Sequence, residues 1–226
     1  MKRMKWLVAA VCLVGMTGCN LIGESVKMDS EQAVEKVNKI LSTQVDTTQF
    51  KVVGINMFES EELSNDMSSL TLTYMSKDGE VYKQDFSKEQ NGDEFKAEEL
   101  DKGLSRSEDF KLVIDYNRIN SINKLDMNLF SDYINKAKAM IPEEYEFASL
   151  HNFIIEESYP TTTRMTLRAL RGNVKDDDEY GKRSIRICLS LLKKGEEKEY
   201  NGRQVITNYY QITLKTNDAG ELEMVE

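Results

Sequence analysis

The residues best suited to catalysis are few and isolated in this chain. His151 is the only histidine, and it lies at the start of a strand-like run. A histidine base needs a nucleophile and an orienting acid within hydrogen-bond reach. Cys188 alternates with apolar residues in another strand-like run, where Arg186 is the only neighbour that could activate a thiol. We interpret His151 as a solvated or hydrogen-bonded strand residue and Cys188 as a small packed residue.

Acidic residues form the other candidate groups. Asp176 to Glu179 are four consecutive acids, whereas calcium loops alternate their carboxylates and use a glycine to turn the chain. We interpret this run as a solvated loop, with weak divalent-cation binding as the alternative. A glycosidase needs two carboxylates facing each other across a cleft. Acids recur at strand ends in both halves of the chain, at Glu59, Glu61, Glu62, Glu156 and Glu157.

No known catalytic signature accompanies these residues. The chain has no glycine-rich phosphate loop, no Gly-x-Ser-x-Gly, no Cys-x-x-Cys and no His-Glu-x-x-His. We therefore expect a protein that is not an enzyme, with no catalytic residues, no metal site and no cofactor.

Two further features concern the surface. Tyr200, Tyr209 and Tyr210 cluster near the C-terminus, and tyrosine is common at interfaces. They are a candidate partner surface, with ordinary strand tyrosines as the alternative. Asp46-Thr47-Thr48 resembles a short bacterial acceptor pattern for O-glycosylation, which makes Thr47 the candidate site and a plain turn the alternative.

The N-terminus resembles a bacterial lipoprotein signal peptide. Three basic residues precede an apolar run from Trp6 to Gly15, and Met16-Thr17-Gly18-Cys19 follows. That run is too short to span a bilayer. A strict lipobox has Leu where this chain has Met16. The resemblance implies a signal peptide over residues 1–18, acylation of Cys19 and a tether over 19–28. It places the protein outside the cytoplasm, at the outer membrane facing the periplasm in a Gram-negative cell or on the outer face of the plasma membrane in a Gram-positive cell.

Composition indicates an acidic globular protein. The chain is 40% hydrophobic and 31% charged, which is outside the disordered range. The signal peptide carries three of the 30 Lys and Arg and none of the 39 Asp and Glu, so its removal changes the formal net charge from −9 to −12. This charge disfavours nucleic acid and anionic lipid as partners. Only Cys188 remains free after acylation of Cys19, so we expect no internal disulfide.

The same order of structural signals appears twice. Apolar residues at helical spacing form two stripes, Ala33, Val34, Val37, Ile40 and Leu41, then 97 residues later Phe130, Tyr133, Ile134, Ala137 and Ile141. Asp29 is expected to cap the first helix with Gln32 as its capping-box partner, and Pro142 to stop the second. Strand-like runs follow each stripe, at 50–58, 70–74, 81–86 and 110–114, and then at 150–155, 165–170, 185–192 and 205–214. Turns are expected at 77–80, 201–202 and 217–220.

These signals predict an α+β fold of two tandem units, residues 29–120 and 121–226, each one helix followed by an antiparallel four-stranded meander. This element order resembles the PepSY-like and beta-lactamase-inhibitor-protein-like modules, and the latter joins two modules into one concave sheet that grips an enzyme. The paired disulfides of that inhibitor are absent here, and fold alone does not give function.

The anchor, the duplication and the missing motifs predict a non-catalytic envelope lipoprotein. It is expected to bind an envelope protein or a cell-wall component through its sheet, and to contact the membrane through its lipid anchor. One alternative is an inhibitor of a cationic enzyme such as a lysozyme. Another is a carboxylate-based polysaccharide hydrolase.

Overall fold

The computed structural model describes residues 25–88, 94–102, 115–159, 180–196, 199–201 and 204–225. Its first elements are α1 (Glu31–Thr43), β1 (Phe50–Glu59), β2 (Met67–Ser76), β3 (Val81–Lys88), β4 (Phe95–Ala97), β5 (Asp101–Lys102) and the short 3-10 helix η2 (Tyr116–Arg118). The later elements are α2 (Met127–Ala139), β6 (Tyr145–Glu157), β7 (Arg183–Lys193), β8 (Glu199–Asn201), β9 (Gln204–Ile206), β10 (Tyr210–Thr216) and β11 (Leu222–Met224).

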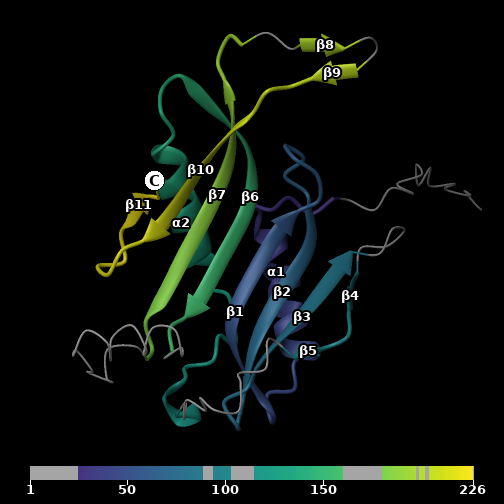
Figure 1. Cartoon of the computed structure of the whole chain (residues 1–226), viewed down its shortest axis with the longest axis vertical. Coiled ribbons are helices and arrows are strands. Elements are labelled where there is room, and N and C mark those ends of the chain that lie inside the picture. The colour runs from purple at the N-terminus through teal and green to yellow at the C-terminus, as the bar shows by residue number, and fades with distance from the viewer. Residues whose placement is uncertain are drawn as a thin grey trace, which may run out of the picture.

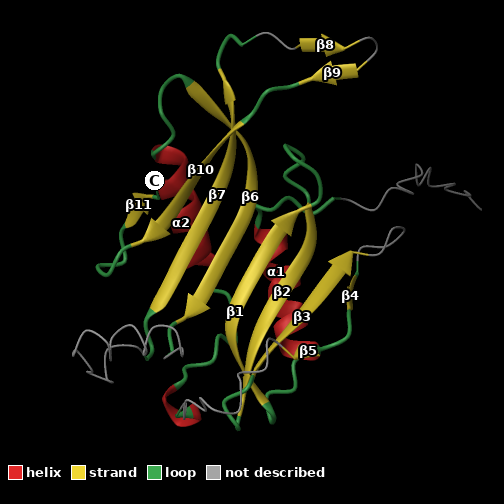
Figure 2. Cartoon of the chain, in the orientation of Figure 1, coloured by secondary structure: helices red, strands yellow, loops and turns green. Residues whose placement is uncertain are grey.

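A nine-stranded antiparallel sheet forms the body of the protein. Its strand order is β11-β10-β7-β6-β1-β2-β3-β4, and β5 also pairs with β3. Helices α1 and α2 lie behind this sheet in Figure 1 and Figure 2, so the two layers are one of helices and one of strands. β8 and β9 form a separate two-stranded sheet beyond one end of the main sheet (Figure 1).

The predicted fold of two tandem helix-plus-meander units is wrong. One continuous sheet passes through both halves of the chain, because β1 pairs with β6 from Gly54↔Glu156 to Phe58↔Asn152. Either strand alone would leave a row of unpaired backbone amides and carbonyls at a sheet edge. Pairing the two strands satisfies those groups, which gives the physical reason for a single sheet.

The strand predictions in the second half also need correction. β6 pairs directly with β7, so the described sheet has no place between them for the strand predicted at 165–170. The run predicted as one strand over 205–214 is divided between β9 and β10. The turn predicted at Asn201-Gly202 falls within the β8–β9 hairpin, where Asn201 faces Gln204. Residues 110–114 and 165–170 lie outside the described residues.

α1 buries its whole predicted stripe, whereas α2 buries three of the five predicted residues, and Tyr133 and Ile141 are only half-buried. All five stripe residues of α1 are buried, and α2 buries Phe130, Ile134 and Ala137. α2 ends at Ala139, shortly before Pro142. The predicted cap of α1 is wrong, because the Ser30 hydroxyl, rather than Asp29, accepts the hydrogen bond from the Ala33 amide.

One hydrophobic core joins the helices to the facing side of the sheet. It contains residues from Val26 to Leu214, on both sides of the boundary predicted near residue 120. In its centre the rings of Phe130 and Phe153 meet edge to face, with centroids 4.8 Å apart. Burial of this apolar area is the main stabilising contribution to the fold.

Candidate functional site

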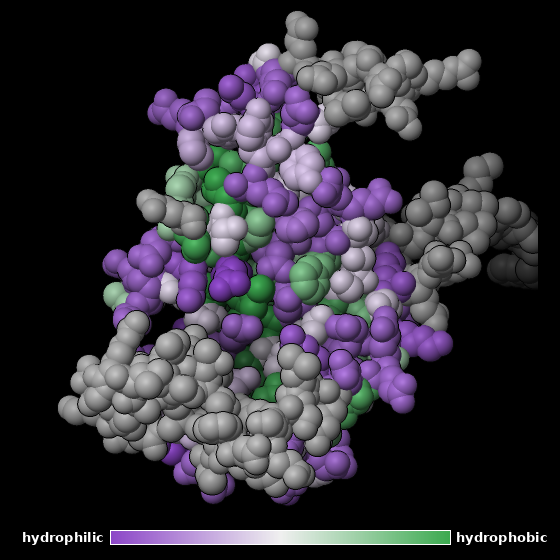
Figure 3. Space-filling view, viewed as in Figure 1, coloured by the Kyte–Doolittle hydropathy of each residue, from purple (hydrophilic) through white to green (hydrophobic). Residues whose placement is uncertain are grey.

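The side of the sheet turned away from the helices, here called the open face, carries mostly short polar side chains. In β7, Ile185, Ile187 and Leu189 are buried toward the helices, so the residues between them point to the opposite side. The same alternation places on the open face Gly54, Asn56 and Phe58; Ser69, Thr71 and Thr73; Lys83, Asp85 and Ser87; Glu146, Asn152, Ile154 and Glu156; Ser184, Arg186, Cys188, Ser190 and Leu192; and Gln211, Thr213 and Lys215. Figure 3 looks onto this face, and hydrophilic residues make up most of the part drawn in colour, with hydrophobic residues between them.

The polar side chains of the open face bind one another across strands. Asn152 Nδ2 donates to Asn56 Oδ1 at 2.6 Å, which links β6 to β1. Thr71 Oγ1 donates to Asp85 Oδ1 at 2.5 Å, which links β2 to β3. Such cross-strand bonds fix the side chains before any partner arrives, so the face is preorganised.

The open face does not share the acidity of the whole chain. By strand register, its charged residues are five bases and five acids: Lys51, Lys83, Lys96, Arg186 and Lys215, and Asp85, Asp101, Glu146, Glu156 and Glu223. The whole chain has a net charge of −9. Most of the excess acid therefore lies on the helix side, at the sheet edges or outside the described residues.

A small second core closes one end of the open face. Val53, Met75 and Ile119 are buried there, with Tyr116, Tyr159 and other apolar residues packed against them. Cations lie over two aromatic rings nearby, with Lys51 Nζ 4.3 Å from the centroid of Tyr116 and the Arg118 guanidinium 4.1 Å from that of Tyr180. This packing is a fixed wall at that end of the sheet.

Beside this wall lies a hollow that we call the terminal groove, with two adjoining parts. The smaller part, of about 160 Å³, is lined by Val53, Gly54, Thr73, Glu156, Glu157, Ser158, Tyr159 and Ser184. The larger part, of about 430 Å³, is lined by Ser158, Lys182, Arg183, Ser184, Lys215, Thr216, Asn217, Asp218, Ala219 and Gly220. Both linings contain Ser158 and Ser184, so the two parts are neighbours at the end of β6 and the start of β7.

Gly54 keeps the floor of the smaller part open. A Cβ atom at this position would lie 3.1 Å from Thr73 Cβ and 3.2 Å from Thr73 Oγ1. The residue stands at a register shift of β1 against β2. A glycine inside a strand pattern is a known signal for a bulge or a close approach, and it is the one sequence signal that could have indicated this groove.

Glu157 is a buried acid in the lining of the smaller part of the groove. Its Oε1 accepts a hydrogen bond from the Asn120 amide, and Arg183 Nε lies 3.7 Å from Oε2. Oε2 has no hydrogen-bond partner among the described residues. Burial raises the pKa of Glu157 against the lowering effects of the Asn120 amide and Arg183. Glu156 points to the opposite side of β6, so these two acids do not face each other across the groove.

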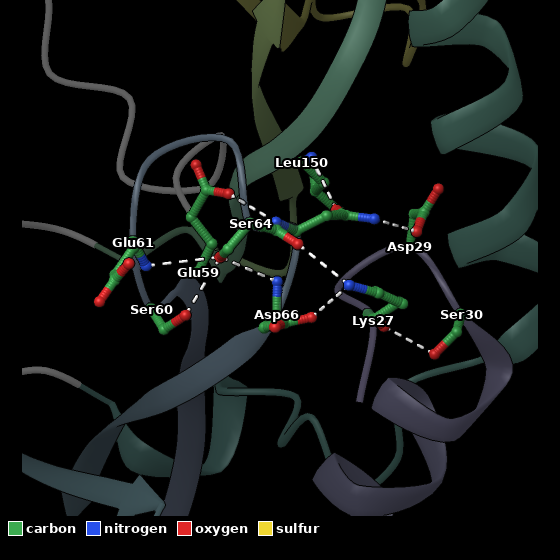
Figure 4. Close-up of polar contacts among 10 residues, drawn as sticks. Lys27, Asp29, Ser30, Glu59, Ser60, Glu61, Ser64, Asp66 and Leu150 are labelled. Carbon is green, nitrogen blue, oxygen red and sulfur yellow. Dashed lines mark hydrogen bonds and ion pairs between the residues drawn. The ribbon is translucent and has the colours of Figure 1, made fainter. Parts of the chain in front are cut away.

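The other buried acid, Glu59, belongs to a hydrogen-bonded group that we call the brace, which also contains Asp29 and Asn65 and part of which Figure 4 shows. Its side chain is 1% exposed. Glu59 accepts hydrogen bonds from Ser149 Oγ at 3.1 Å and from the Asn65 amide at 3.0 Å, and His151 Nδ1 lies 3.0 Å away. Ser149 and His151 contact the same carboxylate oxygen, which is not the arrangement of a nucleophile and its base. His151 is thus a hydrogen-bonded strand residue, as predicted.

Asn65 links the two halves of the chain through the brace. Its Nδ2 donates to Asp29 Oδ1 at 2.7 Å, and its Oδ1 accepts from the Leu150 amide at 2.9 Å. Asp29 also accepts from Lys138 Nζ at 2.6 Å. These contacts explain why Asp29 does not cap α1, and they join the start of the folded body to β6 and α2.

Cys188 lies half-buried on the open face, opposite Asn152 and Thr213 in the neighbouring strands. Burial raises the pKa of its thiol, and the hydrogen bond with Thr213 only partly opposes this. A thiol of this kind is a poor nucleophile at neutral pH.

The candidate partner surface of Tyr200, Tyr209 and Tyr210 stays a prediction. Tyr209 is half-buried, and a hydrogen bond to Glu62 raises the pKa of its hydroxyl. Tyr210 is 38% exposed and packs against the ring of Tyr145, with centroids 5.2 Å apart. The side chain of Tyr200 lies outside the described residues.

Thr47 is exposed in the turn between α1 and β1, where Asp46 Oδ1 accepts hydrogen bonds from the amide and hydroxyl of Thr48. This is the geometry of a plain turn, and glycosylation of Thr47 stays a prediction. Cys19 and the acidic run 176–179 lie outside the described residues.

Comparison with protein-family models, with curated proteins and with solved structures finds no match to this chain. Within the described ranges, no group of histidine, cysteine and acidic side chains is arranged to hold a metal ion. Neither described helix is long and apolar enough to cross a membrane.

Proposed function

We propose that the mature protein is a non-catalytic envelope lipoprotein that binds a cell-wall component on the open face of its sheet. The observation that carries this proposal is the open face itself. Neither α-helix covers it, η2 packs against one end only, and its hydroxyl and amide side chains are held in place by one another. A preorganised polar surface of this kind suits a ligand rich in hydrogen-bonding groups.

The composition of the open face favours a cell-wall component over a protein partner. The centres of protein–protein interfaces are enriched in aromatic residues and methionine. Among its strand residues, the open face offers Phe58 as its aromatic side chain and no methionine outside the wall at one end. Glycans and their attached peptides present hydroxyl, amide and carboxylate groups instead, which match serine, threonine and asparagine.

The start of the folded body is consistent with a membrane anchor at Cys19. Val26 accepts a hydrogen bond from the Met67 amide, and Lys27 pairs with Asp66. The chain between Cys19 and Val26 would reach at most about 25 Å. A lipid on Cys19 would therefore hold this end of the sheet close to the bilayer, and the outer membrane facing the periplasm is the location that we propose.

The two alternative functions receive no support from the described residues. An inhibitor of a cationic enzyme would need an acidic docking face, whereas the open face is nearly balanced in charge. A carboxylate-based hydrolase would need an acid pair across a cleft. Glu156 and Glu157 point to opposite sides of β6, and Glu59 is buried in the brace.

Retention on purified cell walls tests this proposal. The variants Thr71→Arg and Thr213→Arg place a long cation on the open face, and Ser42→Arg places the same charge on the exposed side of α1 as the matched control. We expect the first two variants to lose at least tenfold in retention and the control to bind as wild type. Equal retention of all three would overturn the assignment of the open face, and specific capture of a protein in place of cell wall would overturn the choice of partner.

The anchor needs its own test. Partition of the protein from native membranes into detergent, together with the mass of its N-terminal peptide, reports acylation directly. We expect wild type to partition with the membrane lipids and Cys19→Ala to lose this behaviour. An unmodified N-terminal peptide in wild type would remove the anchor from the proposal and leave the open face unaffected.

A further inference from the structure

The two parts of the terminal groove differ in chemistry. In the smaller part, hydroxyl groups of Thr73 and Ser184 lie beside the Glu156 carboxylate, over a floor opened by Gly54. A carboxylate accepts hydrogen bonds but donates none when ionised, and hydroxyl groups do both. This part therefore suits a ligand that presents several hydroxyl groups.

The larger part is basic. Lys182, Arg183 and Lys215 line it, and Asp218 is its only acidic lining residue. No described residue forms an ion pair with Lys182 or Lys215, and Arg183 Nε lies 3.7 Å from Glu157 Oε2. Three cations around one hollow are unexpected in a chain with a net charge of −9. They attract an anionic group, and a guanidinium is suited to a planar carboxylate.

We propose that the terminal groove binds an acidic saccharide, with its hydroxyl groups in the smaller part and its carboxylate in the larger part. This inference rests on the proposed function, because it names the class of cell-wall component that the open face would take. Glu156 repels a carboxylate from the smaller part, so the orientation of the sugar is fixed by charge. The larger part, at about 430 Å³, falls within the volumes usual for small-molecule sites.

Titration calorimetry with the mature lipidated protein in detergent tests the inference, with trigalacturonate as the acidic probe and maltotriose as its neutral counterpart. We expect trigalacturonate to bind at least tenfold more tightly than maltotriose. Sodium phosphate is the third probe, because it carries the negative charge without the sugar hydroxyls. Phosphate binding as tight as that of trigalacturonate would overturn the inference, since the groove would then be an anion site only.

Three variants assign the binding to the two parts of the groove. Lys182→Gln with Lys215→Gln in one chain removes two cations, and we expect it to weaken trigalacturonate binding at least tenfold. Lys193→Gln removes an exposed cation from the far end of β7 and is the matched control. Thr73→Val removes one hydroxyl from the smaller part and should weaken trigalacturonate binding while leaving phosphate binding unchanged. Unchanged trigalacturonate binding in either of these test variants would overturn the inference.

Trigalacturonate binding by the terminal groove and cell-wall retention by the open face are measured separately, so one can fail without the other. Cell-wall retention that persists without trigalacturonate binding would overturn the acidic saccharide and leave the open face as the binding surface. Loss of both in wild type would overturn both proposals.

Discussion

Removal of the Asn65 side chain is the sharpest test of the brace. Asn65 has a positive φ of 55°, a conformation that costs an ordinary residue about 1 kcal/mol or more. Its side chain donates to Asp29 and accepts from the Leu150 amide. Its backbone amide donates to Glu59, and its carbonyl accepts from Met28. The variant Asn65→Ala would remove only the side-chain bonds and add the cost of the backbone conformation.

The expected loss follows from these parts. A hydrogen bond to a charged acceptor contributes about 1.5 kcal/mol at the lower end of its range, which is appropriate here because Asp29 is 19% exposed and keeps its bond to Lys138. The bond to the Leu150 amide contributes about 1 kcal/mol. With about 1 kcal/mol for the positive φ, Asn65→Ala should lower the free energy of unfolding by about 3–4 kcal/mol.

Urea unfolding of the mature protein with Cys19→Ala measures this loss from the midpoint and slope. Asn65→Gly is the matched control, because glycine accepts a positive φ without cost. It should lose about 1 kcal/mol less than Asn65→Ala. A loss below about 1 kcal/mol for Asn65→Ala would refute the brace, since that is the typical contribution of one hydrogen bond. Equal losses of unfolding free energy in Asn65→Ala and Asn65→Gly would show that the positive φ at this position does not destabilise alanine.

Three further predictions concern single positions in the sheet. The raised pKa of Glu157 means that its carboxyl group keeps its proton to higher pH in the folded than in the unfolded state. The free energy of unfolding of wild type should therefore fall relative to that of Glu157→Gln as pH rises from about 4.5 through the raised pKa. Parallel curves of unfolding free energy against pH for the two proteins would contradict this. The thiol of Cys188 is half-buried and its pKa is raised. At pH 8 it should therefore react with a disulfide reagent at least about tenfold more slowly in the folded than in the urea-unfolded protein. Equal rates in the two states would show that the thiol is accessible in the folded protein. Gly54→Ala should lower the free energy of unfolding by about 1–3 kcal/mol because the added Cβ would lie 3.1 Å from Thr73 Cβ. Thr73→Gly in the same chain should recover part of this loss. Absence of any recovery would show that contact with Thr73 is not the cause of the loss.

Local patterns predicted the local elements well. The helical stripe of α1 became its buried face, and the turn at residues 77–80 has the expected positive φ at Gly79. These features depend on neighbours within a few residues, so spacing alone defines them. Asp29 shows the limit of this reasoning. Ser30 caps α1 instead, because the Asp29 carboxylate accepts hydrogen bonds from Asn65 and Lys138, which are distant in the sequence.

The pairing of β1 with β6 could not be predicted from the sequence. Both strands are mostly apolar runs with several possible neighbours, and nothing in 50–58 or 150–155 specifies which edge meets which. The terminal groove was missed for a related reason. Its lining residues come from β1, β2, β6, β7, β10 and the adjoining loops, including the turn at 217–220, and only Gly54 gave a local signal.

The joint between β1 and β6 has a consequence for the order of folding. Its paired residues lie between 94 and 102 positions apart along the chain, whereas β2 and β3 meet through a short turn at residues 77–80. Closing such a long loop costs more chain entropy than closing a hairpin, and non-local pairings slow the folding of a domain. We therefore expect the hairpins on either side to form early and the central joint to close late. Until it closes, two apolar strand edges stand open in the middle of the molecule, so this is the stage at which aggregation competes with folding.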